Sequence, residues 1–211
     1  MNESAIRLEE QIISLFADRE TQVYHGWILK KMKTHFLVCP LYYKLSERNL
    51  LDIVQNCEKI SAQSGRECVF RIVEHTNDHL RAVLKDIGYE LRKCGIVSEL
   101  SLGDYEGSFA GKKKEYCKKL FLKKKTDGEN LEYVMKENDR IVGIRSQGIL
   151  FLQDADLSDC LSLEDILQFS MINGITKILL DVPEKEELPE RYRRAGFGRN
   201  YTYCCYQKRT I

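Results

Sequence analysis

The chain has 211 residues, a hydrophobic fraction of 43%, a charged fraction of 31% and a formal net charge of +1 at pH 7. This length is sufficient to bury one large hydrophobic core or two small ones. The nearly neutral charge provides no global attraction to nucleic acid or to an acidic membrane surface, and no apolar run is long enough to span a bilayer.

The amino terminus and the cysteines indicate the compartment. Residues 1–11 include acidic side chains and no apolar signal core, so we expect a cytoplasmic protein. The eight cysteines include no Cys-x-x-Cys pair, and we expect all of them to be reduced thiols that mostly fill the core. The four histidines have no partner set at the spacing of metal ligands, so no metal site is predicted.

The first half of the chain alternates between helices and strands. In the clearest helix, residues 45–63, Ser46 can cap the amino end and the apolar residues fall on one face. An almost continuous apolar run at residues 68–73 is typical of a buried strand, and a helix between two strands makes part of the sheet parallel. We predict helices over residues 4–18, 45–63 and 77–86, and strands over residues 22–30, 35–39, 68–73 and 91–100.

The second half begins after a stretch rich in Gly and Ser. There we predict a linker over residues 104–112, which separates a domain of residues 1–103 from one of residues 113–211. Residues 143–148 do not match the Gly-x-Ser-x-Gly motif of a nucleophile and are predicted as a strand with a bulge. We predict helices over residues 161–173 and 187–194, and strands over residues 131–137, 140–147, 149–153, 177–182 and 197–207.

The two halves repeat one pattern of strand, helix and glycine. Gly65 and Gly88 enclose a buried strand and a short helix, and they are 23 residues apart. Gly174 and Gly196 enclose the same pair of elements and are 22 residues apart. This self-similarity indicates a duplicated structural unit.

A tyrosine motif near the carboxyl end carries a family resemblance. Tyr192 lies four residues before Gly196, and Phe197 opens a strand rich in aromatic residues. Taken alone, this pattern also fits a helix-to-strand turn with a surface tyrosine. The pattern Tyr-x-x-x-Gly-Phe followed by a strand resembles the carboxyl-terminal signature of the GNAT acetyltransferase superfamily. The resemblance implies an α/β fold, with a mixed central sheet flanked by helices, that is duplicated into two GNAT-like halves.

The resemblance also implies roles for particular residues. Tyr192 would lie beside the sulfur of coenzyme A and protonate the departing thiolate. Leu150, Phe151 and Leu152 would contact the pantetheine arm through their backbone. The first half has Leu84 at the position that matches Tyr192, so this half would be non-catalytic. The implied cofactor is acetyl-CoA or another acyl-CoA, and the implied acceptor is an amine of a small molecule or a peptide.

The sequence departs from the family at the phosphate-binding loop. The resemblance places this loop on Asp154–Asp159, which has three aspartates and no glycine or basic residue. A carboxylate about 4 Å from a phosphate repels it by about 1 kcal/mol even in water-like surroundings. The asparagine that the family often has seven residues before the tyrosine is Lys185 here. A catalytically inactive GNAT-fold protein that binds another ligand or a protein partner, and has lost coenzyme A binding, therefore remains an alternative.

Eight lysines lie within Lys112–Lys125. If this segment is helical, they form a solvated face opposite Tyr116, Leu120 and Phe121; alternatively they meet the phosphates of coenzyme A. No nucleic-acid-binding module accompanies them, so we expect neither a nucleic-acid nor a membrane partner, and a homodimer is left open. No general base stands out, because Glu99, Glu132 and Glu137 are more typical of surface carboxylates.

Overall fold

The computed structural model describes residues 3–15, 21–41, 49–104, 120–124, 131–136, 141–152, 163–184 and 187–208. The chain divides into two compact units. Unit 1 consists of Met1–Gly95 and Tyr201–Ile211, and unit 2 consists of Ile96–Asn200. Residues 105–112 of the predicted linker lie outside the described part of the chain.

Unit 1 is a mixed sheet with helices on both faces. Its strands run in the order β1-β2-β3-β4-β11-β5. The β1, β2 and β3 strands pair antiparallel, β3 and β4 pair parallel, and β4 and β11 pair antiparallel. The elements are α1 (Glu3–Leu15), β1 (Thr21–Tyr24), β2 (Trp27–Lys31), β3 (His35–Cys39), α2 (Leu50–Gln63), β4 (Glu67–Val73), α3 (Asp78–Asp86), the first part of β5 (Tyr89–Ser101) and the second part of β11 (Gly198–Lys208).

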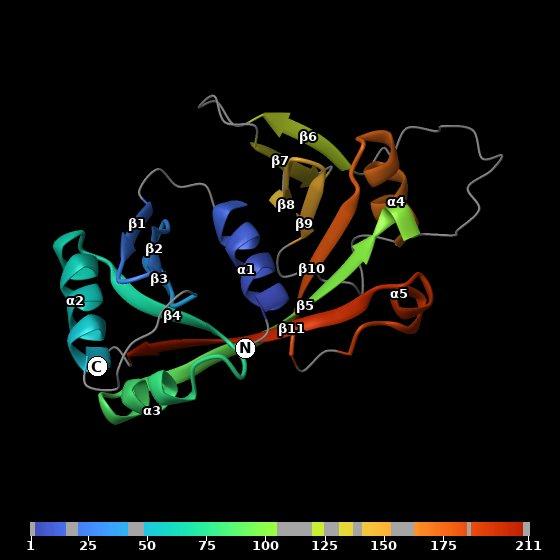
Figure 1. Ribbon diagram of the computed structural model, residues 1–211. Helices are drawn as coiled ribbons and strands as arrows, with labels where there is room; N and C mark the ends of the chain where they lie inside the picture. The colour runs from blue at the N-terminus through green and yellow to red at the C-terminus, as the bar shows by residue number, and fades with distance from the viewer. Residues whose placement is uncertain are drawn as a thin grey trace. The chain divides into compact units, whose positions relative to one another are not determined.

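The two faces of strand β4 carry different helices. Phe70 and Ile72 point into a hydrophobic cluster that includes residues of α2 and α3, and Trp27 is fully buried in the same cluster. Arg71, between them, points to the opposite face and forms an ion pair with Glu9 of α1. Helix α1 therefore lies on one face of the sheet, and α2 and α3 lie on the other (Figure 1).

Unit 2 repeats this arrangement with a longer meander. Its strands run in the order β11-β5-β10-β9-β8-β7-β6. Strands β6 to β9 pair antiparallel, and β9 and β10 pair parallel. The remaining elements are a short 3₁₀ helix (Leu102–Asp104), β6 (Leu120–Lys124), β7 (Leu131–Lys136), β8 (Ile141–Ser146), β9 (Ile149–Leu152), α4 (Leu163–Ile172), β10 (Lys177–Pro183) and α5 (Glu190–Arg194).

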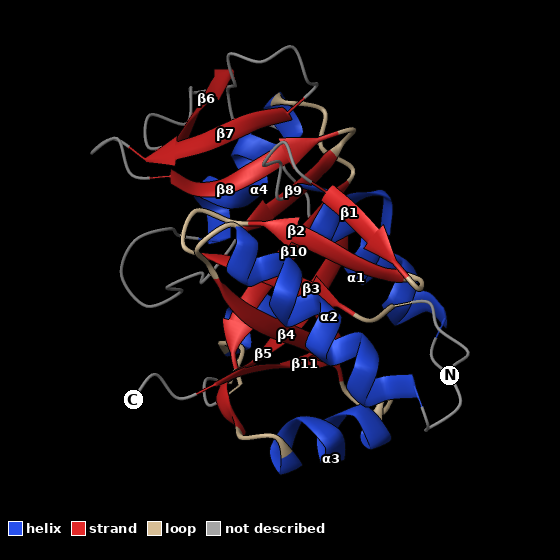
Figure 2. Cartoon of the chain, turned by 90° about the vertical axis from the view of Figure 1, so that its left-hand side faces the viewer, coloured by secondary structure: helices blue, strands red, loops and turns tan. Residues whose placement is uncertain are grey.

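One face of the unit 2 sheet is covered by α4 and α5. Ile166 and Phe169 of α4 pack with Ile178 and Leu180 of β10 and with Tyr192 of α5 in one buried cluster. Figure 2 shows α4 behind the ribbon of β8 and β9. The burial of these apolar side chains supplies the main stabilisation of the unit, at roughly 25 cal/mol for each Å² removed from water.

The predicted repeat is visible in the backbone of both units. Gly65 and Gly88 have φ of +64° and +88°, and Gly174 and Gly196 have φ of +62° and +95°. These left-handed conformations favour glycine after a helix because a Cβ would be strained there. In each unit such a glycine precedes the parallel strand (β4 or β10), and a second one follows the next helix (α3 or α5).

Two long strands belong to both units. Strand β5 begins in unit 1 and ends in unit 2, whereas β11 begins in unit 2 and ends in unit 1. In unit 1 the second part of β11 lies between β4 and the first part of β5. In unit 2 the second part of β5 lies between β10 and the first part of β11. Each repeat thus contributes its last strand partly to its own unit and partly to the other one.

Three local expectations are wrong. The predicted strand over residues 22–30 is a hairpin, because His25 and Gly26 adopt φ of 51° and 80° and turn the chain between β1 and β2. Gln147 and Gly148 likewise form a tight turn between β8 and β9 in place of the predicted bulge. Leu120–Lys124 is a strand paired with β7, so the helical interpretation of the lysine segment fails there, while residues 112–119 lie outside the described part.

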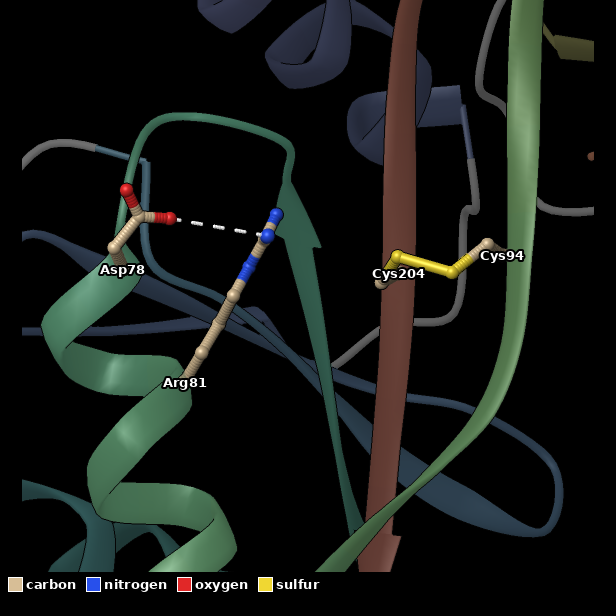
Figure 3. The surroundings of a disulfide bond; sticks show 4 residues. All are labelled: Asp78, Arg81, Cys94 and Cys204. Atoms are coloured by element: carbon tan, nitrogen blue, oxygen red, sulfur yellow. Dashed lines mark ion pairs between the residues drawn. A yellow bond between two sulfur atoms is a disulfide. The ribbon is translucent and has the colours of Figure 1, made fainter.

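The expectation that every cysteine is reduced is also wrong. Cys94 of β5 and Cys204 of β11 form a disulfide in unit 1, with their Cα atoms 4.2 Å apart (Figure 3). Their separation of 110 residues hides the pairing in the sequence, and only the adjacency of β5 and β11 reveals it. Cys39, Cys57, Cys68 and Cys205 are buried thiols, as expected of core residues.

Candidate active site

Tyr192 is held by a short helix and the turn that follows it. The Tyr192 amide donates to the Pro189 carbonyl at 2.9 Å, just before α5. The helix ends at Gly196, and the Phe197 amide donates back to the Tyr192 carbonyl at 3.1 Å. The Phe197 ring also packs edge-on against the Tyr192 ring, with 5.6 Å between the ring centroids. The Tyr-x-x-x-Gly-Phe motif therefore fixes the backbone and the ring of Tyr192 together.

The Tyr192 side chain is a core residue, because its residue exposure is 0%. Burial raises the pKa of its phenol, the nearby Arg191 guanidinium opposes this shift, and the Asp165 carboxylate in the first turn of α4 adds to it. The phenol is consequently protonated throughout the neutral pH range. It can donate a proton or a hydrogen bond, and it cannot act as a base there. The alternative of a surface tyrosine is wrong.

Strand β9 contributes side chains to the hydrophobic cluster that contains Tyr192. Leu150, Phe151 and Leu152 are fully buried. Leu150 and Leu152 belong to the cluster that contains Tyr192, while Phe151 alternates to the other face of the sheet. All four residues of β9 are in register with β8 on one side and with β10 on the other. The backbone of this strand is thus engaged in the sheet up to Leu152.

The parallel pair β9–β10 ends before β10 does. Leu180 is the last residue of β10 that is in register with β9, opposite Leu152. Strand β10 continues through Asp181 and Val182 to Pro183. Ligands in α/β sheets bind preferentially beyond the carboxyl ends of parallel strands. This end of β10 is therefore a candidate ligand position in unit 2.

The structure brings a buried carboxylate to this end that the sequence analysis missed. Asp181 has a residue exposure of 2%. An aspartate inside the apolar run ILLDV was the available signal, because a charged residue is almost never fully buried without a specific role or partner.

Two of the carboxylates considered from the sequence are partly buried and held by neighbouring side chains. Glu99 accepts a hydrogen bond from Asn200 at 2.9 Å and forms an ion pair with Lys177 at 2.8 Å. Glu132 forms an ion pair with Arg145 across β7 and β8. Glu137 lies outside the described part. A cavity of about 380 Å³ beside Glu99 and Gly196 lies at the amino end of β10, away from Asp181.

Several predicted site elements fall where the structure is not described. These are Asp154–Asp159, Lys185 and most of the lysine cluster. Within the described ranges, no three His, Cys, Asp or Glu side chains are grouped to hold a metal ion. Likewise, no helix of those ranges is long and apolar enough to cross a membrane.

Unit 1 has different side chains at the matching positions. Leu84 of α3 is fully buried at the position of Tyr192. Arg71 is the first residue after the part of β4 that pairs parallel with β3. Asp181 is likewise the first residue after the part of β10 that pairs parallel with β9. The Arg71 guanidinium is bound to Glu9, and the Tyr201 hydroxyl donates to the same carboxylate. At the positions that match Tyr192 and Asp181, unit 1 thus has a buried leucine and an arginine held in an ion pair.

The fold agrees with solved structures of one superfamily. A GCN5-related N-acetyltransferase from Kribbella flavida is similar over 98% of this chain and 96% of its own, with a TM-score of 0.62 and 14% identity. A GCN5-related N-acetyltransferase from Sphaerobacter thermophilus is similar over 86% and 75%, with a TM-score of 0.52 and 12% identity. A structure from Pyrococcus horikoshii is similar over 88% and 69%, with a TM-score of 0.56 and 11% identity.

Sequence comparisons do not detect this relationship. A scan against protein-family models finds no match, and a search of curated proteins also finds none. Identities of 11–14% lie below the level at which side chains can be equated, so the similarity concerns the backbone. The mixed sheet flanked by helices, as predicted from the sequence, is the fold of the GCN5-related N-acetyltransferase (GNAT) superfamily.

Proposed function

We propose that this protein is an N-acyltransferase that transfers an acetyl or other acyl group from acyl-CoA to an amine of a small molecule or a peptide. The reaction would take place in unit 2, at the carboxyl end of the β9–β10 pair. The amine nitrogen would attack the thioester carbonyl, the carbon–sulfur bond would break, and the departing thiolate would take the proton of the Tyr192 hydroxyl.

The observation that carries this proposal is the buried, protonated phenol of Tyr192. It packs in one cluster with Leu150 and Leu152 of β9 and with Leu180 of β10. Low polarity around a proton donor strengthens its hydrogen bond to a developing anion. A surface tyrosine in a simple helix-to-strand turn would have neither the burial nor the raised pKa.

The proposal also includes a contact between strand β9 and the pantetheine arm of coenzyme A. Because β9 is paired on both sides, the ligand would meet the strand at Leu152, where the register with β10 ends. Leu150 and Phe151 would support this end from within the sheet. The acidic Asp154–Asp159 segment follows directly in the sequence. The phosphates of coenzyme A would therefore need cations from another segment, for which Lys112–Lys125 is the candidate.

The second candidate is a GNAT-fold protein that has lost catalysis and binds another ligand or a protein partner. Two observations favour it. The three aspartates in Asp154–Asp159 would repel a phosphate, and the side chains of Tyr192, Leu150, Phe151 and Leu152 are buried. Direct binding of acyl-CoA distinguishes the two candidates, since only the transferase requires it.

The test is a measurement of coenzyme A release from acetyl-CoA over a panel of primary amines and amino-terminal peptides. We expect release that depends on the amine, and a Tyr192→Phe variant that is slower by about 10²–10⁴-fold, the range of a lost general acid. If the wild-type protein releases no coenzyme A with any acceptor and calorimetry detects no binding of acetyl-CoA, the inactive alternative replaces this proposal.

A further inference from the structure

Unit 1 has a cavity of its own, with a volume of about 290 Å³, that is lined by residues of α2, β4, β5 and β11. Glu58 and Ser61 come from α2, Cys68 comes from the start of β4, and Tyr89 comes from the start of β5. Because it borders the amino end of β4, the cavity is distinct from the carboxyl end of the parallel β3–β4 pair. Pockets for small ligands have volumes of roughly 300–1,000 Å³, so this cavity is suited to a small molecule.

The buried part of the cavity wall carries no charge at neutral pH. It consists of Ser61, Cys68 and Tyr89, and the Cys68 thiol is hydrogen-bonded to the other two side chains. Burial raises the pKa of the Cys68 thiol to about 12 and also raises the pKa of the Tyr89 phenol. Both groups are therefore protonated at pH 7, and the thiol is not a nucleophile there. This part of the wall offers a polar but uncharged surface to a ligand.

The remaining wall of the cavity carries charges of both signs. Two carboxylates, Glu58 and Glu67, and two bases, Arg66 and Lys208, line it. Their formal charges cancel, so the cavity has no net attraction for a simple anion or a simple cation. The side chain of Glu58 is 26% exposed and Arg66 is partly exposed, so both can be reached from solvent. A ligand that has both charges and no net charge matches this wall.

Two of these charged groups retain hydrogen-bonding capacity. The Tyr89 hydroxyl donates to Glu58 Oε1 at 2.9 Å, and Lys208 Nζ pairs with the same oxygen at 2.8 Å. Among the residues that the structure describes, Glu58 Oε2 therefore has no partner. In the same described ranges the Arg66 guanidinium, which has only donors, has neither a hydrogen bond nor an ion pair. One cavity is thus bordered by an open carboxylate oxygen and an open guanidinium group.

A zwitterion supplies the complements of both groups. An ammonium group can donate to Glu58 Oε2, and a carboxylate can accept two parallel hydrogen bonds from the Arg66 guanidinium. Unit 1 shows the second kind of contact elsewhere, since Arg71 binds both oxygens of the Glu9 carboxylate. An α-amino acid has the two charged groups on a single carbon atom, which suits a cavity of this size.

We propose that the cavity of unit 1 binds a free α-amino acid, with its ammonium group on Glu58 and its carboxylate on Arg66. The buried surface of Cys68 and Tyr89 then faces the rest of the ligand. No bond is made or broken at this site. The inference does not depend on the transferase function, because the cavity belongs to unit 1 and Tyr192 belongs to unit 2. It gives unit 1 a ligand of its own.

The test is calorimetric titration of the full chain with each of the standard amino acids at millimolar concentration. We expect saturable binding of at least one of them. Its carboxamide, which lacks the carboxylate, and its N-acetyl derivative, which lacks the ammonium group, should bind about 10- to 100-fold more weakly, the range for one lost hydrogen bond to a charged group.

Variants assign each end of the ligand to one side chain. Arg66→Gln should bind the amino acid as weakly as wild type binds the carboxamide, and it should no longer distinguish the two compounds. Glu58→Gln should likewise no longer distinguish the amino acid from its N-acetyl derivative. Lys85→Gln and Asp86→Asn, which remove exposed charges of the same signs from α3, are the controls and should bind as wild type does.

Three results would overturn the inference. The first is that no amino acid binds wild type saturably, and the second is that the carboxamide or the N-acetyl derivative binds as tightly as the amino acid. The third is that Arg66→Gln still prefers the amino acid to its carboxamide, because the ligand would then lie elsewhere in the protein. Arg66→Gln carries the test even if Glu58→Gln does not fold, since the Arg66 side chain has no contact to lose among the described residues.

Discussion

The Arg71 guanidinium of β4 donates to both carboxylate oxygens of Glu9 in α1, and its Nη2–Oε2 distance is 3.0 Å. Both side chains are nearly inaccessible to solvent, at 4% and 0% exposure. The Tyr201 hydroxyl donates to the same carboxylate, and Arg71 lies 3.3 Å from the centroid of the Tyr203 ring. One ion pair thus joins α1, β4 and β11 of unit 1, at the position where unit 2 has Asp181.

Removal of one partner of this ion pair should strongly destabilise the protein. We expect Glu9→Met to lower the free energy of unfolding by about 3–5 kcal/mol, because it leaves the Arg71 charge buried and uncompensated. The Glu9→Met/Arg71→Met double variant should recover most of this loss. Urea unfolding checks both values. Glu190→Ala, which removes exposed ion pairs with Arg193 and Arg194, is the control and should cost at most about 1 kcal/mol. A single variant as stable as wild type would show that the pair is not buried in solution.

The Cys94–Cys204 disulfide should contribute measurably to stability. It closes a loop with a sequence separation of 110 residues, for which about 2–4 kcal/mol is typical. We expect a reductant to lower the urea midpoint of wild type and of Cys57→Ser, and to leave Cys94→Ser unaffected. Peptide mapping without reduction should recover the two cysteines in one linked pair. Equal midpoints in the presence and absence of reductant would contradict the disulfide.

Stability should decrease when the pH rises above 9, because burial raises the pKa of both Cys57 and Cys68 to about 12. Below pH 9 both thiols are protonated in the folded and the unfolded chain. Between pH 9 and 12 the unfolded chain loses these protons and the folded chain keeps them, which favours unfolding by up to about 1.4 kcal/mol per pH unit for each thiol. Urea unfolding at pH 8 and pH 10 measures this slope, which should be smaller in a Cys57→Ala/Cys68→Ala variant. An unchanged stability between these pH values would mean that the thiols are accessible to water.

The Tyr192→Phe variant should separate catalysis from stability. It removes one buried hydroxyl, which costs about 0.5–1.5 kcal/mol of stability, while turnover should fall by about 10²–10⁴-fold. Tyr89→Phe is the matched control, since it removes the 2.9 Å hydrogen bond to Glu58 in unit 1. We expect Tyr89→Phe to cost similar stability and to retain full turnover. Equal turnover in Tyr192→Phe and wild type would remove Tyr192 from the mechanism.

Much of the fold could be predicted from local patterns. The helices at residues 50–63 and 78–86 and the buried strands at residues 67–73 and 177–183 follow from apolar periodicity and from the glycines that end the helices. The hairpin at His25 and Gly26 was missed because histidine gives no strong turn signal. The partition of β5 and β11 between two units was also missed, because strand pairing over a hundred residues leaves no local pattern.

The candidate site was only partly predictable. Tyr192 could be proposed as a site residue from the sequence because its motif lies within six consecutive residues. The place of Asp181 at the end of the β9–β10 register could not be predicted, since it depends on strand pairing. The same reason hides Arg71 and Glu9, which are 62 residues apart in the chain. Residues whose role comes from tertiary contacts require the fold before they can be interpreted.

The central claim is that unit 2 uses acyl-CoA, and thermal unfolding with and without millimolar acetyl-CoA tests it most directly. A ligand that binds only the native state stabilises it by about 2.7 kcal/mol at a hundredfold excess over Kd, which raises the Tm of a chain of this size by several degrees. We predict such a shift for wild type and for Tyr192→Phe, because in the proposed mechanism the Tyr192 hydroxyl acts on the departing thiolate and not on cofactor binding. The absence of any shift in wild type with acetyl-CoA and with coenzyme A would contradict the account.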